Sequence, residues 1–468
     1  MRLTSHRLAL KQDQLISAST RAVFQIMLLV VELMANKLGL NSRNSSIPPS
    51  QDINRKKPAT SKRTVTGKKP GGQPGHIGST LEPVDHPDEV VTLPLDKRSL
   101  PKGECWESVG YEARQVIELH IQRKVVEYQA QIMRNQRGQQ RTATFPADAK
   151  RPIQYGHSVI AHAVYLSMYQ LIPYERLQNQ FQDMFGIDLS MGTLVNFNQQ
   201  LAQRLHRVFK PLAIEQIALA DVACADETGV NINASRHWVH GISSTHWALL
   251  TPHKQRGVQA MKDIGVLPRF KGVLVHDHWS AYLQFECQHQ YCNAHYLREL
   301  IRAHEQDDCR WAKLMHALLL KINQAVTDAG GELSESAIKG YRKRYRSLIT
   351  RGEKESPVSP SEAGKRGRPK QSKARNLLDR LRIYEDDTLR FMTDAKVPFT
   401  NNQGEREIRM LKVQQKISGC FRSAGNAENY CLFRSYLSSC LKHGVSASEG
   451  INLLARNEWP EFIKQHLR

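Results

Sequence analysis

Apolar and polar residues follow two different periods along the chain, and the changes of period mark its parts. Between residues 219 and 305, short apolar runs typical of strands alternate with stretches of helical period. The runs "ALADVACADE", "INASRHWVHGI" and "THWALLTPH" predict three strands, "GVQAMKDIG" a helix and "GVLVHDHW" a further strand, before "QYCNAH" and the helix "YLRELIRAHE". This β-β-β-α-β-α-β-α order predicts an α/β core in which a right-handed crossover lays the fourth strand parallel to the first.

The segments before this core carry other patterns. Residues 1–40 predict a helix ending at Gly39, and its apolar run Val23–Met34 is either an oligomer interface or a helix buried within one chain. Short alternating runs from Pro83 to Thr144 predict a small β-rich module. The segment "PYERLQNQFQDMFGIDLSMGTLVNFNQQLAQRL" predicts two helices, the first ended by Gly186 and the second capped by Ser190. They form a helix-turn-helix or an ordinary helical hairpin.

The charge of the chain indicates its partner. The 468 residues carry a formal charge of +21, which favours association with nucleic acid. The run Val23–Met34 is shorter than a membrane-spanning helix, and residues 1–20 lack the apolar core of a signal peptide. We therefore expect a cytoplasmic, nucleoid-associated protein without a membrane partner, whose eight cysteines are reduced.

Two segments concentrate the positive charge. Residues 51–70 hold seven cations, Lys56 and Lys57 among them, against one anion, which predicts a flexible basic arm. Residues 339–375 hold thirteen cations and three anions, and include "KRGRPK". Its Arg366 and Arg368 match the core of an AT-hook, which enters the A·T minor groove, or belong to a solvated basic loop that contacts phosphates.

Three acids at the ends of predicted elements suggest a metal site. The crossover places Asp226 and Asp277 at neighbouring strand ends, and Glu405 heads a predicted helix with Arg409, Lys412 and Lys416 on the same face. In one interpretation Asn402 is the N-cap and Glu405 completes a capping box, with the cations in solvent.

In the other interpretation the three acids bind two Mg²⁺ ions for phosphodiester transfer, and the cations hold DNA phosphates. Glu407, rotated by about 200° around the helix, should then tolerate substitution.

Several motifs together closely resemble the insertion-sequence-66 family of DDE transposases. They are "ADETG", "HDHWSAY", "CNAHYLREL", "FTNNQGEREIRMLKVQQKISGCFRS" and, upstream, "NSRNSSIPPS" and "GGQPGHIG". The resemblance implies an RNase H-like core, a mixed sheet flanked by helices, with Asp226, Asp277 and Glu405 as a catalytic triad that binds Mg²⁺, for which Mn²⁺ can substitute.

The family's Cys-x-x-His signature corresponds to Cys292, His295, Arg298 and Glu299. With Cys287 and His289 it would bind Zn²⁺, or it has a hydrogen-bonded structural role. His276 and His278 flank Asp277 and are expected to alternate across the sheet without touching metal.

The sequence departs from the family pattern in two places. Of the paired cysteines of a zinc ribbon, only Cys105 is present near the β-rich module, so we expect no structural zinc. Asp277 and Glu405 are 405 − 277 = 128 residues apart, which is long for a compact RNase H core and predicts an insertion.

These observations divide the chain into eight parts. They are an N-terminal helix with a candidate oligomerisation role (1–45), a basic linker (46–82), a β-rich module like a degenerate zinc ribbon (83–150), a helical DNA-binding segment (151–212), the first part of the core (213–304), a basic helical insertion (305–395), the core helix with the third acid (396–445) and a helical tail (446–468).

The resemblance implies a transposase that binds the terminal inverted repeats of an insertion sequence, cleaves at its ends and joins them to target DNA by Mg²⁺-dependent transesterification. Pairing of two DNA ends implies a homo-oligomer in a synaptic complex. Accessory proteins of the same element are a further candidate class of partner. Two alternatives are a nuclease of the same fold that only hydrolyses DNA, and a DNA-binding protein derived from a transposase without catalysis.

Overall fold

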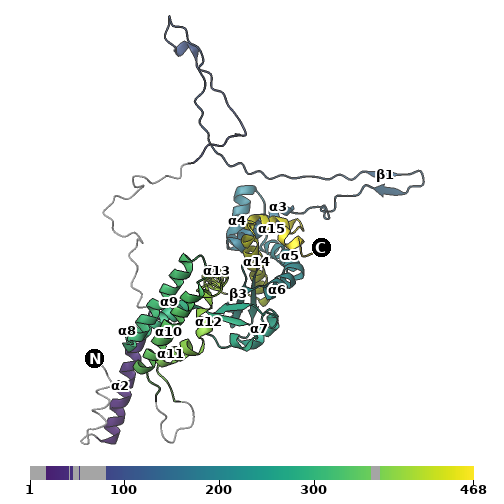
Figure 1. The fold of residues 1–468 in the computed structure, drawn as a ribbon. Coiled ribbons are helices and arrows are strands. Elements are labelled where there is room, and N and C mark those ends of the chain that lie inside the picture. The colour runs from purple at the N-terminus through teal and green to yellow at the C-terminus, as the bar shows by residue number, and fades with distance from the viewer. Residues whose placement is uncertain are drawn as a thin grey trace. The chain divides into compact units, whose positions relative to one another are not determined.

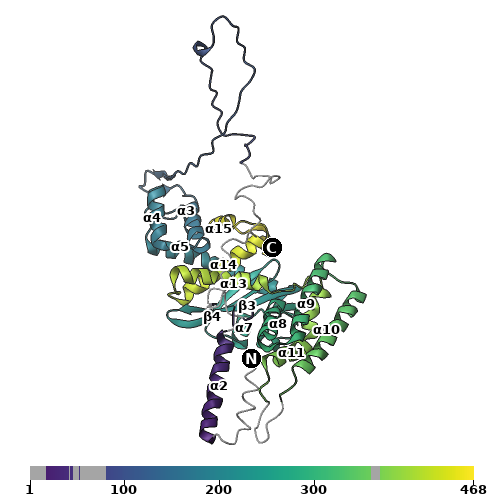
Figure 2. The same ribbon diagram turned by 90° about the vertical axis from the view of Figure 1, so that its left-hand side faces the viewer.

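A five-stranded mixed sheet with helices on both sides organises the larger part of the chain (Figures 1 and 2). The computed structural model describes residues 17–38, 40–41, 43–45, 52, 81–359 and 369–467. Contacts divide the chain into two units, residues 56–127 and the remainder. The sheet belongs to the second of these.

The strands of the sheet are β3 (Val222–Ile232), β4 (Ser235–Ser243), β5 (Ala248–His253), β6 (Val273–His276) and β7 (Gln288–Tyr291). Their order is β5-β4-β3-β6-β7, with antiparallel pairing from β3 to β5 and parallel pairing from β3 to β7. The predicted order of strands and helices along the chain and the parallel pairing of β6 with β3 are confirmed, although the element between β6 and β7 is only the short 3₁₀ turn Tyr282–Gln284.

A tight turn joins β3 to β4. Asn233 and Ala234 both have positive φ angles, of 46° and 60°, and Ile232 pairs directly with Ser235. Positive φ at both central residues matches the twist of a two-residue hairpin, and Asn tolerates this conformation better than most residues. The hairpin lets β3 continue well past the point where β6 ends.

Two apolar cores lie against the sheet. One includes side chains of β3, β4 and β5 together with the helices before the sheet and those at the C-terminal end, among them Phe209 and Phe433. The other includes Tyr291 and the helices that follow β7, and buries Trp311 and Tyr345.

The helices before the sheet are α3 (His157–Val164), α4 (Tyr174–Phe185), α5 (Met191–Arg204) and α6 (Lys210–Ala218), with π-helical turns at Tyr165–Tyr169 and Leu205–Phe209. Gly186 ends α4 in the left-handed conformation, at φ 59°, and the hydroxyl of Ser190 accepts the backbone N–H of Thr193 at 3.0 Å. Both predicted helix boundaries are confirmed.

The predicted insertion is helical. After α7 (Val258–Ile264), the last strands of the sheet and α8 (Asn293–Asp307), it consists of α9 (Arg310–Asp328), α10 (Glu335–Glu355), α11 (Lys373–Ile383), α12 (Glu385–Leu389) and the 3₁₀ turn Arg390–Met392. Several of its cations are paired with carboxylates: Arg342 and Arg346 with Glu385, and Arg382 with Glu353. Part of its positive charge is therefore neutralised within the fold.

The chain then returns to the sheet through α13 (Asn402–Ser418), α14 (Ala424–Lys442), α15 (Ala447–Ala455) and α16 (Glu461–Lys464). Helix α14 lies against the edge strand β5. The hydroxyls of Ser439 and Ser435 accept the backbone N–H groups of Ala248 and Leu250, at 3.0 and 2.8 Å. These bonds satisfy donors that an edge strand would otherwise leave buried without a partner.

The prediction of a β-rich module at residues 83–150 is wrong for the residues that the structure describes. The strands that the structure describes there are β1 (Ile132–Arg134) and β2 (Gln140–Thr142), which pair in an isolated hairpin, besides the 3₁₀ turn Lys97–Ser99. Side chains such as Val116 and Leu119 are exposed. Alternation indicates a strand only where a second layer covers its apolar side, and no such layer covers these described residues.

At the N-terminal end, the structure describes helix α2 (Ala18–Leu38). Its side chains Val23, Met27 and Met34 are exposed. Within the described residues, no helix combines the length and the apolar character needed to cross a membrane. The basic arm with Lys56 and Lys57 lies outside the described residues.

Candidate active site

Two of the predicted acids lie on adjacent parallel strands. In the pairing of β3 with β6, Val222 faces Val273 and Cys224 faces Val275, an offset of 273 − 222 = 51 residues. The same offset leads from Asp226 to Asp277, the residue directly after β6. The crossover therefore brings the two carboxylates to the same end of this strand pair, as predicted.

One detail of that prediction is wrong. Asp226 lies in the middle of β3, not at its end. The apolar run stops at Asp226, but the chain continues as a strand because β4 pairs with β3 up to Ile232. Asp226 lies just beyond the residues of β3 that pair with β6, where the sheet continues with the antiparallel strands β3, β4 and β5.

Helix α13 brings Glu405 to these acids because it lies directly on β3 and β4. Gly241, the β4 partner of Asp226, makes the close approach possible. A Cβ at this position would lie 2.9 Å from Cγ2 of Ile408 and 3.0 Å from Cδ2 of Leu250. Only glycine leaves room for Ile408 at this distance.

Asn401 fixes the start of α13 on the sheet. Its side-chain amide donates to the carbonyl oxygen of Ala225 at 2.7 Å, and its backbone N–H donates to Sγ of Cys292 at 3.2 Å. Gly404 allows this packing, since a Cβ there would lie 2.7 Å from Oδ1 of Asn401. One buried residue thus connects the helix of Glu405 with the strand of Asp226. Asn401 was not predicted from the sequence, where an asparagine just before the helix is the only indication of its role.

The capping-box interpretation of Glu405 is wrong in this structure. The N-cap position belongs to Asn401, whose side chain makes no capping hydrogen bond, and Asn402 is the first residue of the helix. Gly404 therefore occupies the third helical position, where a capping box needs Glu or Gln. Glu405 is one residue further on and is free of that role.

The charges of Asp277 and Glu405 both act on Asp226, although among the described residues the three acids do not form a group whose ligand atoms all lie within 4.8 Å of one another. Burial, and then the neighbouring charges of Glu227, Asp277 and Glu405, raise the pKa of Asp226 to about 8, against a hydrogen bond from the N–H of Glu227. Negative charge is therefore costly at Asp226 without a nearby cation.

A second buried acid next to Asp226 was not predicted. Glu227 accepts the hydroxyl of Tyr282 at 2.6 Å and Nε of Arg256 at 3.0 Å. The guanidinium of Arg256 lies between the rings of Trp238 and Trp279, 4.7 and 4.2 Å from their centroids. No sequence spacing connects these residues, because the fold alone brings them together.

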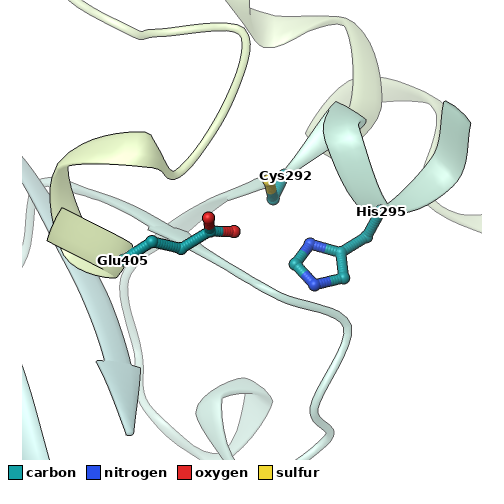
Figure 3. Close-up of side chains that lie close together, drawn as sticks. All are labelled: Cys292, His295 and Glu405. Carbon is teal, nitrogen blue, oxygen red and sulfur yellow. The ribbon is translucent and has the colours of Figure 1, made fainter. Parts of the chain in front are cut away.

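The Cys-x-x-His signature lies beside the third acid. One ligand atom each of Cys292, His295 and Glu405 falls within 4.8 Å of the others. Figure 3 shows the imidazole of His295 and the carboxylate of Glu405 pointing toward one another, next to the sulfur of Cys292. Of the other signature residues, Glu299 forms an ion pair with Arg380 of the insertion, and Arg298 is half-buried near His295.

The other cysteine and histidines have different neighbours. Nε2 of His276 lies 3.0 Å from Nδ1 of His289, and burial lowers the pKa of His276 to about 3. The ring of His278 packs against Tyr296, with the centroids 3.9 Å apart. Among the described residues, Cys287 and His289 do not join Cys292 and His295 in a metal-ligating cluster.

The predicted DNA-binding cations of α13 differ in their surroundings. Arg409, Lys412 and Lys416 are all exposed residues, but only for Lys412 does the structure give a hydrogen bond of the charged group, from its Nζ to the carbonyl oxygen of Gly229 at 2.7 Å. Burial, and then the charge of Arg236, lower the pKa of Lys412. Arg366 and Arg368 lie outside the described residues.

Glu407 is not the neutral control that its position on the helix suggested. Its carboxylate accepts the hydroxyl of Ser438 at 2.9 Å and forms an ion pair of 3.0 Å with Lys442, and both charged side chains are largely buried. Removing its charge would leave Lys442 without its partner.

The comparison with protein families gives two matches. Residues 152–429 match the family described as Transposase IS66 family, and residues 8–82 match a family of unknown function. The comparison with curated proteins found no match. The first match covers more than half of the chain, including the sheet, the helical insertion and α13. The chain therefore belongs to the IS66 family of transposases.

Proposed function

We propose that this transposase acts by a DDE mechanism, with Asp226, Asp277 and Glu405 as the acids that hold Mg²⁺. The observation that carries the proposal is geometric: the register of β3 with β6 aligns Asp226 with Asp277, and α13, which bears Glu405, packs on β3 and β4. Burial, and then neighbouring charges that include those of Asp277 and Glu405, raise the pKa of Asp226 to about 8. An arrangement of like charges in a buried place is unfavourable unless a cation joins it.

The topology supports an RNase H-like core. Three antiparallel strands are followed by a helix and two parallel strands, in the order β5-β4-β3-β6-β7, and the helix of the third acid packs across β3 and β4. The helical insertion lies between β7 and α13, which accounts for the long separation between Asp277 and Glu405.

The donor atoms fit magnesium. Three carboxylates supply the hard oxygen ligands that Mg²⁺ prefers, and Asp277 and Asp226 each also accept one backbone N–H, which fixes their orientation. When bound, two Mg²⁺ ions activate the attacking oxygen and stabilise the leaving oxygen of phosphodiester transfer. Asn401 and Gly241 hold α13 so that Glu405 reaches the two aspartates.

The cationic side of α13 would position the DNA. Arg409 lies about one turn beyond Glu405 and Lys416 about three turns beyond it, and both side chains are exposed to solvent. They would contact phosphates next to the scissile bond, so that the 3′-hydroxyl of one end is aligned with the target strand. The same proposal includes recognition of the terminal inverted repeats by the protein. It also includes the pairing of two DNA ends by a homo-oligomer in the cytoplasm.

A strand-transfer assay tests this proposal. Purified protein is given DNA ends that already carry a free 3′-hydroxyl, a target duplex and Mg²⁺, and the products are separated by size. We expect joined products. Cleavage without joining would indicate the hydrolytic nuclease, and binding without any chemistry would indicate a DNA-binding protein without catalysis.

A further inference from the structure

Cys292, His295 and Glu405 form a group whose chemistry differs from that of the three acids. Sulfur and imidazole nitrogen are poor ligands for Mg²⁺ and good ligands for Zn²⁺ and its spectroscopic substitute Co²⁺. The three ligand atoms lie within 4.8 Å of one another. A tetrahedral zinc ion with bonds of about 2.0–2.3 Å would need them roughly 3.5 Å apart. Small rotations of the side chains of His295 and Glu405, which are half-buried, can supply the difference.

The surroundings of Cys292 favour a sulfur ligand. Cys292 is fully buried at the N-cap of α8, and its sulfur accepts the backbone N–H of Asn401 at 3.2 Å. Backbone donors and a helix N-terminus stabilise the negative sulfur that a metal ion requires.

His295 has a ring nitrogen available for coordination. Its Nδ1 is buried and has no hydrogen-bond partner in the structure, which is costly for a polar atom. In Figure 3 the ring of His295 faces the carboxylate of Glu405.

We propose that Cys292, His295 and Glu405 bind one zinc-class divalent ion, with a fourth coordination position open to water. This site shares Glu405 with the proposed magnesium site, because the two oxygens of a carboxylate can serve ions on either side. It differs from a zinc ribbon, which is closed by four protein ligands. It also differs from the set with Cys287 and His289 considered from the sequence.

Titration of the metal-free full-length protein with Co²⁺ tests the site without any DNA. Thiolate coordination gives a charge-transfer absorption in the near ultraviolet that oxygen ligands do not give. We expect this band to saturate at one ion per chain and to disappear when Zn²⁺ is added. Cobalt in the proposed magnesium site would produce no such band, so the result does not depend on the DDE mechanism.

Variants assign the ligands. Cys292→Ser should abolish the band, and His295→Gln and Glu405→Gln should each weaken cobalt binding by about tenfold or more. Cys420→Ser, at an exposed cysteine, is the matched control and should keep the band. Circular dichroism verifies folding, and His295→Gln decides the question if Cys292→Ser does not fold.

A wild-type protein without the band at millimolar Co²⁺ would overturn the proposal. So would a band that survives in folded Cys292→Ser, or one that His295→Gln leaves unchanged. In those cases the cluster has only the hydrogen-bonded structural role.

Discussion

At the scale of single residues, the side chain that does most to assemble the site is an uncharged one. Asn401 is almost completely buried and bonds both Ala225, next to Asp226, and the sulfur of Cys292. It is 176 residues away from Ala225 in the chain. We infer that it positions Glu405 without itself touching the substrate.

Asn401→Ala tests this role. The variant leaves the buried carbonyl of Ala225 without its donor, which should lower the free energy of unfolding by about 1–3 kcal/mol. Strand transfer should fall by about tenfold or more, because Glu405 loses its fixed position. The matched control is Asn402→Ala at the exposed next residue, which should change stability by less than about 0.5 kcal/mol. Equal behaviour of the two variants in both assays would refute a positioning role.

The residues predicted from the sequence are those that belong to recognisable motifs. Asp226, Asp277 and Glu405 were proposed through such motifs; the register of β3 and β6 aligns the two aspartates, and the charge of Glu405 acts on Asp226. Glu227 and its partners Tyr282 and Arg256 were not found. Their hydrogen bonds join segments distant in sequence, and neither period nor spacing carries information on such contacts.

At the scale of elements, the site depends on how closely α13 approaches the sheet. Ile408 sits over Gly241, and the helix contacts both β3 and β4. The helix itself was predictable from its period, and the ends of α4 and α5 from Gly186 and Ser190. The exact start of α13 was not predictable, because Asn401 turns toward the sheet instead of capping the helix.

Gly241→Ala should separate α13 from the sheet. The added methyl group would overlap with Ile408 and Leu250, at a cost of about 1–3 kcal/mol in unfolding free energy. The double variant Gly241→Ala/Ile408→Ala should recover part of that loss, measured by denaturant unfolding. Gly425→Ala, where a Cβ meets no atom within 4 Å, is the control and should not destabilise the protein. Strictly additive effects of Gly241→Ala and Ile408→Ala would contradict the proposed contact.

The expected β-rich module shows where element prediction fails. Alternating residues between 83 and 144 predicted strands, yet side chains such as Val116 are exposed and the strands described there are those of one short hairpin. A period of two residues indicates which side chains would share one face of a strand. It does not indicate whether another layer of the protein covers that face.

At the scale of the whole molecule, the large positive charge is not all available to DNA. Arg342 and Arg346 of the insertion are paired with Glu385, whereas Arg409 and Lys416 of α13 are exposed. The family membership implies DNA binding, and the charge should make that binding strongly dependent on salt.

The slope of log affinity against log salt concentration should be roughly −5 to −9, as for contacts to six to ten phosphates. Replacing Arg409 and Lys416 by Ala should make it shallower by about 2, because two phosphate contacts are lost. The same replacement of the ion-paired Arg342 and Arg346 should leave the slope nearly unchanged. A slope near −1 for the wild type, or an equal change in both double variants, would show that this assignment of the charge is wrong.

The most direct test of the central claim is the strand-transfer rate of Glu405→Gln in Mg²⁺. The exchange keeps the shape of the side chain and removes the anionic oxygen that a hard cation needs. Glu286→Gln serves as the matched control, since Glu286 is an exposed glutamate in the connection between β6 and β7. The account predicts that Glu405→Gln loses strand transfer by orders of magnitude while it folds and binds DNA ends, and that Glu286→Gln stays within a few-fold of wild type. Joining of DNA ends by Glu405→Gln at nearly the wild-type rate would contradict the assignment of the triad.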